Sequence, residues 1–167
     1  DTLATSGLRG RKDRQGDGRL LFTEVTITNT DGNRVENVRS GEDIALILSY
    51  EIGDGKPKTN VSVGISFYGI SGEHLFTCWT DMLNSNFEQL FPDERLICEI
   101  PKLPLSAGRY SFNIYCEVNG VLADWVLQAG VLSVVEGDYF GTGRMPPQSH
   151  GGLLVDHRWR RDRRTNE

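Results

Sequence analysis

The chain has 167 residues, of which 38% are hydrophobic and 25% are charged, so it is long enough and apolar enough to bury the core of one domain. The formal net charge is −5, and the acidic excess lies in the middle of the chain because residues 1–16 and 157–167 are both basic. An acidic body argues against a nucleic-acid partner. No apolar run approaches the roughly 18 residues that a membrane-spanning helix needs.

The two ends of the chain are predicted to lie outside the folded domain. Residues 1–16 lack hydrophobic periodicity and are interpreted as the remnant of a linker. Their polar, charged composition does not fit a signal peptide, so we expect a cytoplasmic protein or a fragment of a longer one. Residues 160–167 form an Arg-rich basic tail, which we expect to be solvated, with contact to an anionic partner as the alternative.

Between these ends the chain alternates short strand-like segments with turn signals. Alternating segments occur around residues 20–29, 43–52, 61–70 and 109–118, and dipeptides such as Asp31-Gly32 separate them. Turn signals recur about every 8 to 12 residues, and no segment has a convincing helical period. The pattern predicts an all-β fold, an immunoglobulin-like or jelly-roll β-sandwich of about eight antiparallel strands within residues 17–137.

The stretch 61–81 is predicted to be a hairpin with a turn at Ser71-Gly72. In its first strand Val63, Ile65 and Phe67 share one parity and suit a core, whereas the opposite parity suits a face against which something else lies. That face is either a sugar-binding surface or an ordinary surface of the sandwich. On that second face, and on its continuation in the returning strand, the candidate binding residues are Ser66, Tyr68, Thr77 and Trp79.

A second hairpin is predicted around Asn119-Gly120, a strong two-residue turn signal. Its first strand alternates a core face, beginning at Tyr110, with an outward face that includes Asn113 and Tyr115. Tyr110 follows Gly108-Arg109 and resembles the tyrosine that pins a corner in such sandwiches. The two hairpins form one binding surface only if they belong to the same sheet.

Asp124 and Trp125 in the second hairpin have two interpretations. The carboxylate accepts hydrogen bonds from two sugar hydroxyls and the indole stacks on a pyranose ring, which predicts a binding role. Alternatively, Trp125 belongs to the core and Asp124 to a turn.

Several kinds of chemistry are absent from the sequence. Cys78, Cys98 and Cys116 are odd in number and have no CxxC spacing, which favours reduced, buried thiols over a disulfide framework or a zinc site. There is no Walker A, GxSxG or HExxH motif, so we predict no catalytic residue, metal or cofactor. Glu88 and Asp93 lie in one loop and do not by themselves form the opposed pair of a glycosidase.

Residues 138–159 are predicted to be a C-terminal extension. The segment is rich in Gly and Pro but also contains Tyr139, Phe140 and Trp159, so it is not a simple linker. Leu153 to Val155 are predicted to form a short strand on an exposed sheet edge, which in an oligomer belongs to a neighbouring protomer.

The order of these segments resembles the C-terminal carbohydrate-binding domain of Wzt, the ATP-binding subunit of O-antigen polysaccharide ABC transporters. The resemblance spans residues 16–159 and is carried by the sequences GDGRLLFTEVTITNTDGN, VRSGEDIALILSYE, VSVGISFYGISGEHLFTCWTD, LPLSAGRYSFNIYCEVNGVLADW and VVEGDYFGTGRMPPQSHGGLLVDHRW.

This resemblance implies a β-sandwich that binds the finished polysaccharide before export and carries no ATPase activity of its own. It also implies a homodimer with C-terminal strands exchanged between protomers. The implied partners are the ATP-binding domain and membrane subunit of the transporter, at the inner face of the inner membrane. The expected carbohydrate-binding residues are Ser66, Tyr68, Thr77, Trp79, Asn113, Tyr115, Asp124 and Trp125. The alternative function is a structural dimerisation or protein-interaction sandwich without glycan affinity.

Overall fold

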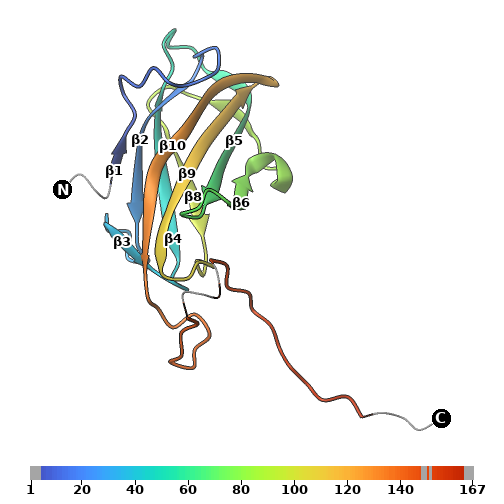
Figure 1. Cartoon of the computed structure of the whole chain (residues 1–167). Coiled ribbons are helices and arrows are strands. Elements are labelled where there is room, and N and C mark those ends of the chain that lie inside the picture. The colour runs from blue at the N-terminus through green and yellow to red at the C-terminus, as the bar shows by residue number, and fades with distance from the viewer. Residues whose placement is uncertain (1–4, 148–149, 151, 164–167) are drawn as a thin grey trace.

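The structure, a computed structural model, describes residues 5–147, 150 and 152–163, and it is a sandwich of two β-sheets (Figure 1). The described residues form ten strands and one 3₁₀ turn, and none of them forms a helix that is long and apolar enough to cross a membrane. The elements are β1 (Thr5–Gly7), β2 (Leu21–Thr28), β3 (Asn37–Arg39), β4 (Ile44–Glu51), β5 (Lys58–Tyr68), β6 (His74–Trp79), η1 (Thr80–Leu83), β7 (Phe87–Leu90), β8 (Arg95–Ile100), β9 (Gly108–Val118) and β10 (Val121–Val135). The predicted all-β sandwich is confirmed, with two more short strands than expected.

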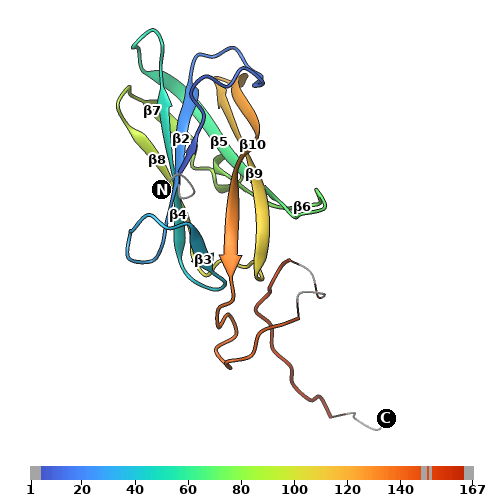
Figure 2. The same cartoon turned by 60° about the vertical axis from the view of Figure 1, so that its left-hand side comes forward.

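One sheet has the strand order β1-β2-β4-β8, and the other has the order β3-β10-β9-β5-β6, with β7 also paired to β5. In Figure 2 the two layers are seen from the side, with β4 and β8 on the left and β9 and β10 on the right. All neighbouring strands are antiparallel except β3 and β10, which are parallel. Because β5 pairs with both β6 and β9, the two predicted hairpins lie in the same sheet.

The core lies between the sheets and follows the period-2 pattern of the sequence. On β5 the odd-numbered residues point inward, and on β9 the even-numbered residues do so. Their neighbours on each strand point outward. The buried side chains of these two strands are Val61, Val63, Ile65, Phe67, Tyr110, Phe112, Ile114, Cys116 and Val118. The core face predicted for Val63, Ile65 and Phe67 is therefore confirmed.

Two local predictions are also confirmed. The hydroxyl of Tyr110 is buried and donates to the carbonyl oxygen of Ser106 at 2.7 Å, which is the contact of a tyrosine corner. Asn119 and Gly120 have φ angles of 51° and 77° between β9 and β10. Positive φ at both central residues is the requirement of a type I′ turn, whose twist matches that of the flanking strands.

Residues 5–16, part of the predicted linker remnant, lie against the sandwich in the structure. β1 pairs with β2, and Leu8 is fully buried in the core. Further along, Gln15 forms an antiparallel bridge with Trp125 of β10. The segment is too short and irregular to show periodicity, so its place in the fold depends on contacts with distant strands.

A buried ion pair joins this segment to β10. Arg14 Nε lies 3.6 Å from Asp124 Oδ1, and Asp124 Oδ2 accepts a hydrogen bond of 2.9 Å from the backbone N–H of Phe22. The guanidinium also donates to the carbonyl oxygens of Leu8 and Phe22. One side-chain pair thus connects the N-terminal segment, β2 and β10.

Burial raises the pKa of Asp124, because the loss of solvation outweighs the Phe22 N–H and the charge of Arg14. The folded protein therefore holds this proton more tightly than the unfolded chain does. This carboxyl contributes stability below its unfolded pKa, and the contribution is lost as the pH rises through the folded value.

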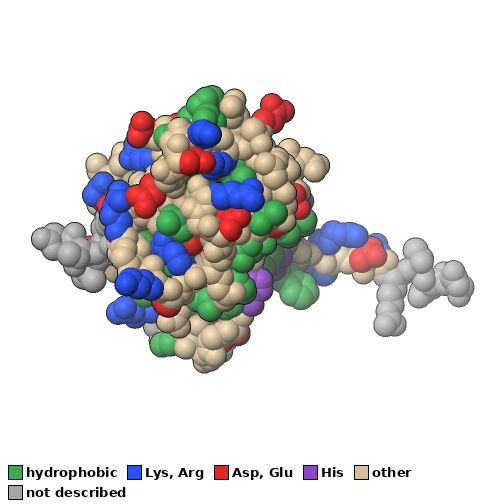
Figure 3. Space-filling model, turned by 90° about the horizontal axis from the view of Figure 1, so that it is seen from above, with side chains coloured by type: hydrophobic (Ala, Val, Ile, Leu, Met, Phe, Trp, Pro, Cys, Tyr) green, Lys and Arg blue, Asp and Glu red, His purple; other side chains and the backbone are tan. Residues whose placement is uncertain are grey.

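The C-terminal extension folds back on the same chain. Leu154 N donates to the carbonyl oxygen of Pro104 at 2.7 Å, and Leu153 forms an antiparallel bridge with Leu105. Tyr139 is buried, and its ring accepts a cation–π contact from Lys102 at 4.3 Å. Beyond these contacts the tail leads away from the sandwich, with its Arg side chains at one side of the body (Figure 3).

We predict that Arg14→Ala lowers the free energy of unfolding by about 3 kcal/mol, because it leaves a buried carboxylate without its partner cation. Urea denaturation followed by circular dichroism measures the change. The control is Arg9→Ala, which removes an exposed ion pair with Glu51 and costs less than about 1 kcal/mol. A loss for Arg14→Ala as small as that of the control contradicts the structural role of the pair.

Candidate functional site

The outer face of the larger sheet carries a depression of about 360 Å³ formed by β5, β6, β9 and β10. We call it the aromatic hollow, and its lining residues are Gly64, Ser66, Tyr68, Thr77, Trp79, Asn113, Tyr115, Glu117 and Trp125. Seven of the eight predicted binding residues line it. The eighth, Asp124, does not.

Strand register brings these side chains together. Gly64 of β5 pairs with Trp79 of β6 and with Tyr115 of β9, and Tyr115 pairs in turn with Trp125 of β10. Paired residues point to the same side of a sheet and neighbouring strands lie about 4.8 Å apart. The pairing therefore sets three aromatic rings in one row across four strands. In the adjacent row Ser66 pairs with both Thr77 and Asn113, which supplies hydroxyls and an amide.

Gly64 forms the floor of the hollow. A Cβ at this position would lie 3.3 Å from Cδ1 of Trp79, which is tighter than ordinary van der Waals contact. The missing side chain lets the indole of Trp79 pack closely over the backbone of Gly64. On the far side of Tyr115 the ring of Trp125 meets it edge to face, with centroids 6.2 Å apart.

Hydrogen bonds hold the two central rings in place. The indole Nε1 of Trp79 donates to Ser62 Oγ, and the hydroxyl of Tyr115 donates to Glu117 Oε2, both at 2.8 Å. Burial and this bond to Glu117 raise the pKa of Tyr115 to about 12. The phenol is therefore protonated at neutral pH and remains the donor in its bond with Glu117.

The polar side chains leave hydrogen-bonding capacity toward the hollow. Asn113 Oδ1 accepts from the backbone N–H of Gln128 at 2.8 Å, which leaves the amide NH₂ free to donate. Ser66 Oγ and Thr77 Oγ1 lie 2.8 Å apart, and His74 Nε2 lies 2.8 Å from the same Thr77 oxygen. At the end of this row the half-buried ring of Tyr68 contacts the ring of His74, with centroids 5.2 Å apart.

The expected binding role of Asp124 is corrected by the structure. Its side chain is fully buried on the core side of β10, where it binds Phe22 N and Arg14. Successive residues of a strand point to opposite faces, so Trp125 faces the hollow while Asp124 faces inward. A register shift lies between Leu122 and Asp124, so alternation counted from the start of the strand does not predict which of its residues face inward.

Two lining residues were not nominated from the sequence. Gly64 and Glu117 share the outward parity of Ser66 and Tyr115, so parity alone was an available signal for both. Gly64 contributes through the absence of a side chain, which residue-type reasoning does not indicate. In the part of the chain that the structure describes, no group of three or more His, Cys, Asp or Glu side chains has the arrangement of a metal site.

The fold and the hollow define a β-sandwich binding domain. The family model of the Wzt C-terminal domain matches residues 11–147, and the chain belongs to this family. Domains of the family are known as the non-catalytic carbohydrate-binding domains of O-antigen ABC transporters.

A solved structure supports the fold. The protein described as "Crystal structure of the C-terminal domain of wzt" superposes with a TM-score of 0.70 at 12% sequence identity, covering 94% of this chain and 92% of that chain. A comparison with curated protein sequences gives no match.

Proposed function

We propose that this chain is a carbohydrate-binding module that recognises an O-antigen-type polysaccharide for export by an ABC transporter, and that the aromatic hollow is its binding site. The observation that carries the proposal is the row of Trp79, Tyr115 and Trp125, in which Gly64 pairs with both Trp79 and Tyr115. A concave site with rigid aromatic walls and few polar groups is the usual form of a small-ligand site. Catalysis and ATP hydrolysis are not part of the proposed function.

The chemistry of the hollow matches a sugar. The apolar face of a pyranose ring packs on the indole of Trp79 or the phenol of Tyr115, and the ring hydroxyls bond to Asn113, Thr77 and Glu117. Each hydrogen bond contributes on the order of 1 kcal/mol because water competes for the same groups. A single site then binds with a dissociation constant of roughly 10 μM to 1 mM.

The proposal includes a homodimer that works with the ATP-binding domain and the membrane subunit of a transporter, at the inner face of the inner membrane. Two hollows on one dimer engage one polymer and gain avidity over a single site. The contacts of Leu153 and Leu154 with Pro104 and Leu105 are backbone pairings with the segment between β8 and β9, and the same pairings can be made by a neighbouring protomer.

The alternative, a protein-interaction sandwich without glycan affinity, is favoured by one observation. Met82, Leu83 and Ile97 are exposed beside a groove between β6 and β8. Such an apolar surface suits a protein partner. The protein-interaction alternative does not explain the polar and aromatic rows on the other face of β6, whereas the glycan proposal does.

We predict that Trp79→Ala and Tyr115→Ala each raise the dissociation constant for the polysaccharide about tenfold, because a stacked ring contributes on the order of 1 kcal/mol. Isothermal titration calorimetry with O polysaccharide released from the lipopolysaccharide of the source organism measures the effect. The control is Trp159→Ala, since Trp159 is 91% exposed in the tail. Wild-type affinity in both hollow variants means that the binding site lies elsewhere.

We also predict that Gly64→Val weakens binding of the same polysaccharide at least tenfold, because the new side chain fills the floor and displaces the indole of Trp79. Valine suits a strand, so the far-ultraviolet circular dichroism spectrum stays that of the wild type. The matched control is Gly53→Val, where an added Cβ meets no atom within 4 Å. Equal binding by the two variants argues against the hollow as the site.

A further inference from the structure

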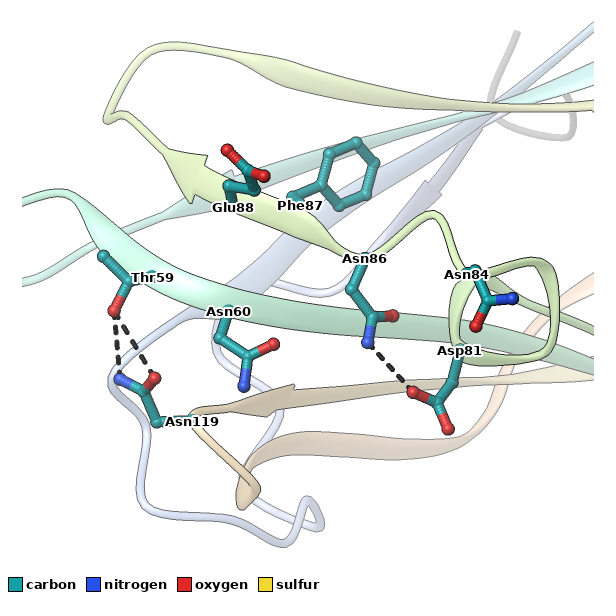
Figure 4. Close-up of a pocket in the computed structure, with 8 residues that line it drawn as sticks. All are labelled: Thr59, Asn60, Asp81, Asn84, Asn86, Phe87, Glu88 and Asn119. Atoms are coloured by element: carbon teal, nitrogen blue, oxygen red, sulfur yellow. Dashed lines mark hydrogen bonds between the residues drawn. The ribbon is translucent and has the colours of Figure 1, made fainter.

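A second polar pocket opens at the end of the same sheet, and the proposed function does not use it. It has a volume of about 510 Å³ and lies among the start of β5, η1, β7 and the turn between β9 and β10 (Figure 4). We call it the amide pocket, and its lining residues are Thr59, Asn60, Asp81, Asn84, Asn86, Phe87, Glu88 and Asn119. Six of these eight side chains carry an amide or a carboxylate.

Part of this polar lining is held in place by the protein. Asn86 Nδ2 donates to Asp81 Oδ1 at 2.9 Å, and Asn86 Oδ1 accepts from Thr80 Oγ1 at 2.8 Å. Asn119 is similarly paired with Thr59 through two contacts of 3.1 and 3.4 Å (Figure 4). These bonds order the amides before a ligand arrives, which reduces the entropy lost on binding.

The other part of the lining has unused capacity. Among the described residues, the side chains of Asn60, Asn84 and Glu88 have no hydrogen-bond partner, and the second hydrogen of Asn86 Nδ2 is also available. An amide both donates and accepts, and a carboxylate accepts through two oxygens. Such a mixture matches the vicinal hydroxyl groups of a sugar, each of which also donates and accepts.

Other ligands fit the pocket less well. Asp81 and Glu88 repel phosphate and acidic sugars, which selects against anions. In the described part of the chain these two carboxylates do not belong to a group of three or more potential metal-binding side chains. Phe87 also lines the pocket, but its side chain packs against the core, so the polar groups dominate the lining.

The amide pocket and the aromatic hollow share no lining residue, but both lie along β5 and along β9 with the turn that follows it. Ser62 pairs with Glu117 between the row of Gly64 and Tyr115 and the row that leads to the amide pocket. Glu117 itself lines the hollow, and Ser62 binds the indole of Trp79. Asn60 lies four residues before Gly64, so the two ends of this surface are about 13 Å apart along the strand.

We propose that the amide pocket is a second glycan subsite, which binds neutral, hydroxyl-rich sugar units of the same polysaccharide chain that occupies the aromatic hollow. The inference rests on the proposed function and extends it, because it assigns a direction and a length to the bound polymer. The glycan runs along β5 and β9 rather than across the strands. Affinity therefore depends on chain length.

The test replaces asparagines of the pocket whose backbone conformation glycine also adopts. Asn60, Asn84 and Asn119 have φ angles of 50°, 51° and 51°, a region that glycine adopts without strain. The triple variant Asn60→Gly, Asn84→Gly and Asn119→Gly therefore removes three amides and keeps the backbone conformation. The single variant Asn84→Gly, in the exposed segment after η1, serves if the triple variant does not fold.

The probes are size-fractionated fragments of the O polysaccharide of the source organism, from single repeat units to long chains, titrated by calorimetry. We expect the wild type to bind long fragments at least tenfold more tightly than short ones. The triple variant, or Asn84→Gly to a smaller extent, loses this difference and binds short fragments as the wild type does. Trp79→Ala weakens binding of both lengths.

The outcomes separate the two proposals. Wild-type affinity of the glycine variants for long fragments overturns the second subsite, and so does an equal loss for both lengths in a folded variant. Wild-type affinity of Trp79→Ala for every fragment overturns the hollow instead. The matched control is Asp93→Gly, which replaces a residue with φ of 71° that does not line the pocket and leaves both affinities unchanged.

Discussion

The antiparallel pairing of β5 with β9 is the constraint on which both the core and the candidate site depend. In this register Gly64 lies opposite Tyr115 and Ile65 lies opposite Ile114. The side-chain period of a strand is two, so a slip of one residue would turn the core residues outward and the residues that line the hollow inward. Burial of Ile65 and Ile114 thus stabilises the same register that places Gly64 beside Tyr115. The free energy gained by burying the core therefore also stabilises the strand register that forms the hollow.

In β10 a buried residue and a residue of the aromatic hollow are neighbours in the sequence. Asp124 and Trp125 are adjacent, but one is buried with Arg14 and the other lines the hollow. A charged group in the interior is tolerated because the N-terminal segment supplies its partner cation and Phe22 supplies a backbone N–H. The contacts of residues 8–15 with β10 therefore help to hold the strand that presents Trp125.

The chemical character of the side chains on the outer face of the larger sheet changes along its strands. Around Gly64 the side chains are mainly aromatic, and toward Asn60 they are mainly amides and carboxylates. Ser62 and Glu117 lie between the two regions. Ser62 accepts a hydrogen bond from the indole of Trp79, and Glu117 accepts one from the hydroxyl of Tyr115. A rigid sheet with a graded surface suits an extended polymer better than a compact small molecule, because successive units meet different chemistry.

The sequence alone determined the features that depend on neighbouring residues. Alternation specified the strands and their inward faces, Asn119-Gly120 specified a turn with two positive φ angles, and Gly108-Arg109-Tyr110 specified the tyrosine corner. These follow from local backbone and burial preferences, which are visible within a few residues. Outward parity is also a local property, and seven of the eight nominated residues line the aromatic hollow.

Which strands are neighbours depends on long-range packing that the local sequence does not encode. The pairing of Gly64 with Tyr115 joins residues about fifty positions apart, and no local pattern encodes it. The inward turn of Asp124, the packing of residues 5–16 and the amide pocket likewise depend on strand register, bulges and contacts between distant segments. Parity tells which residues of a strand share a face, but the energy of packing distant strands together decides which faces adjoin.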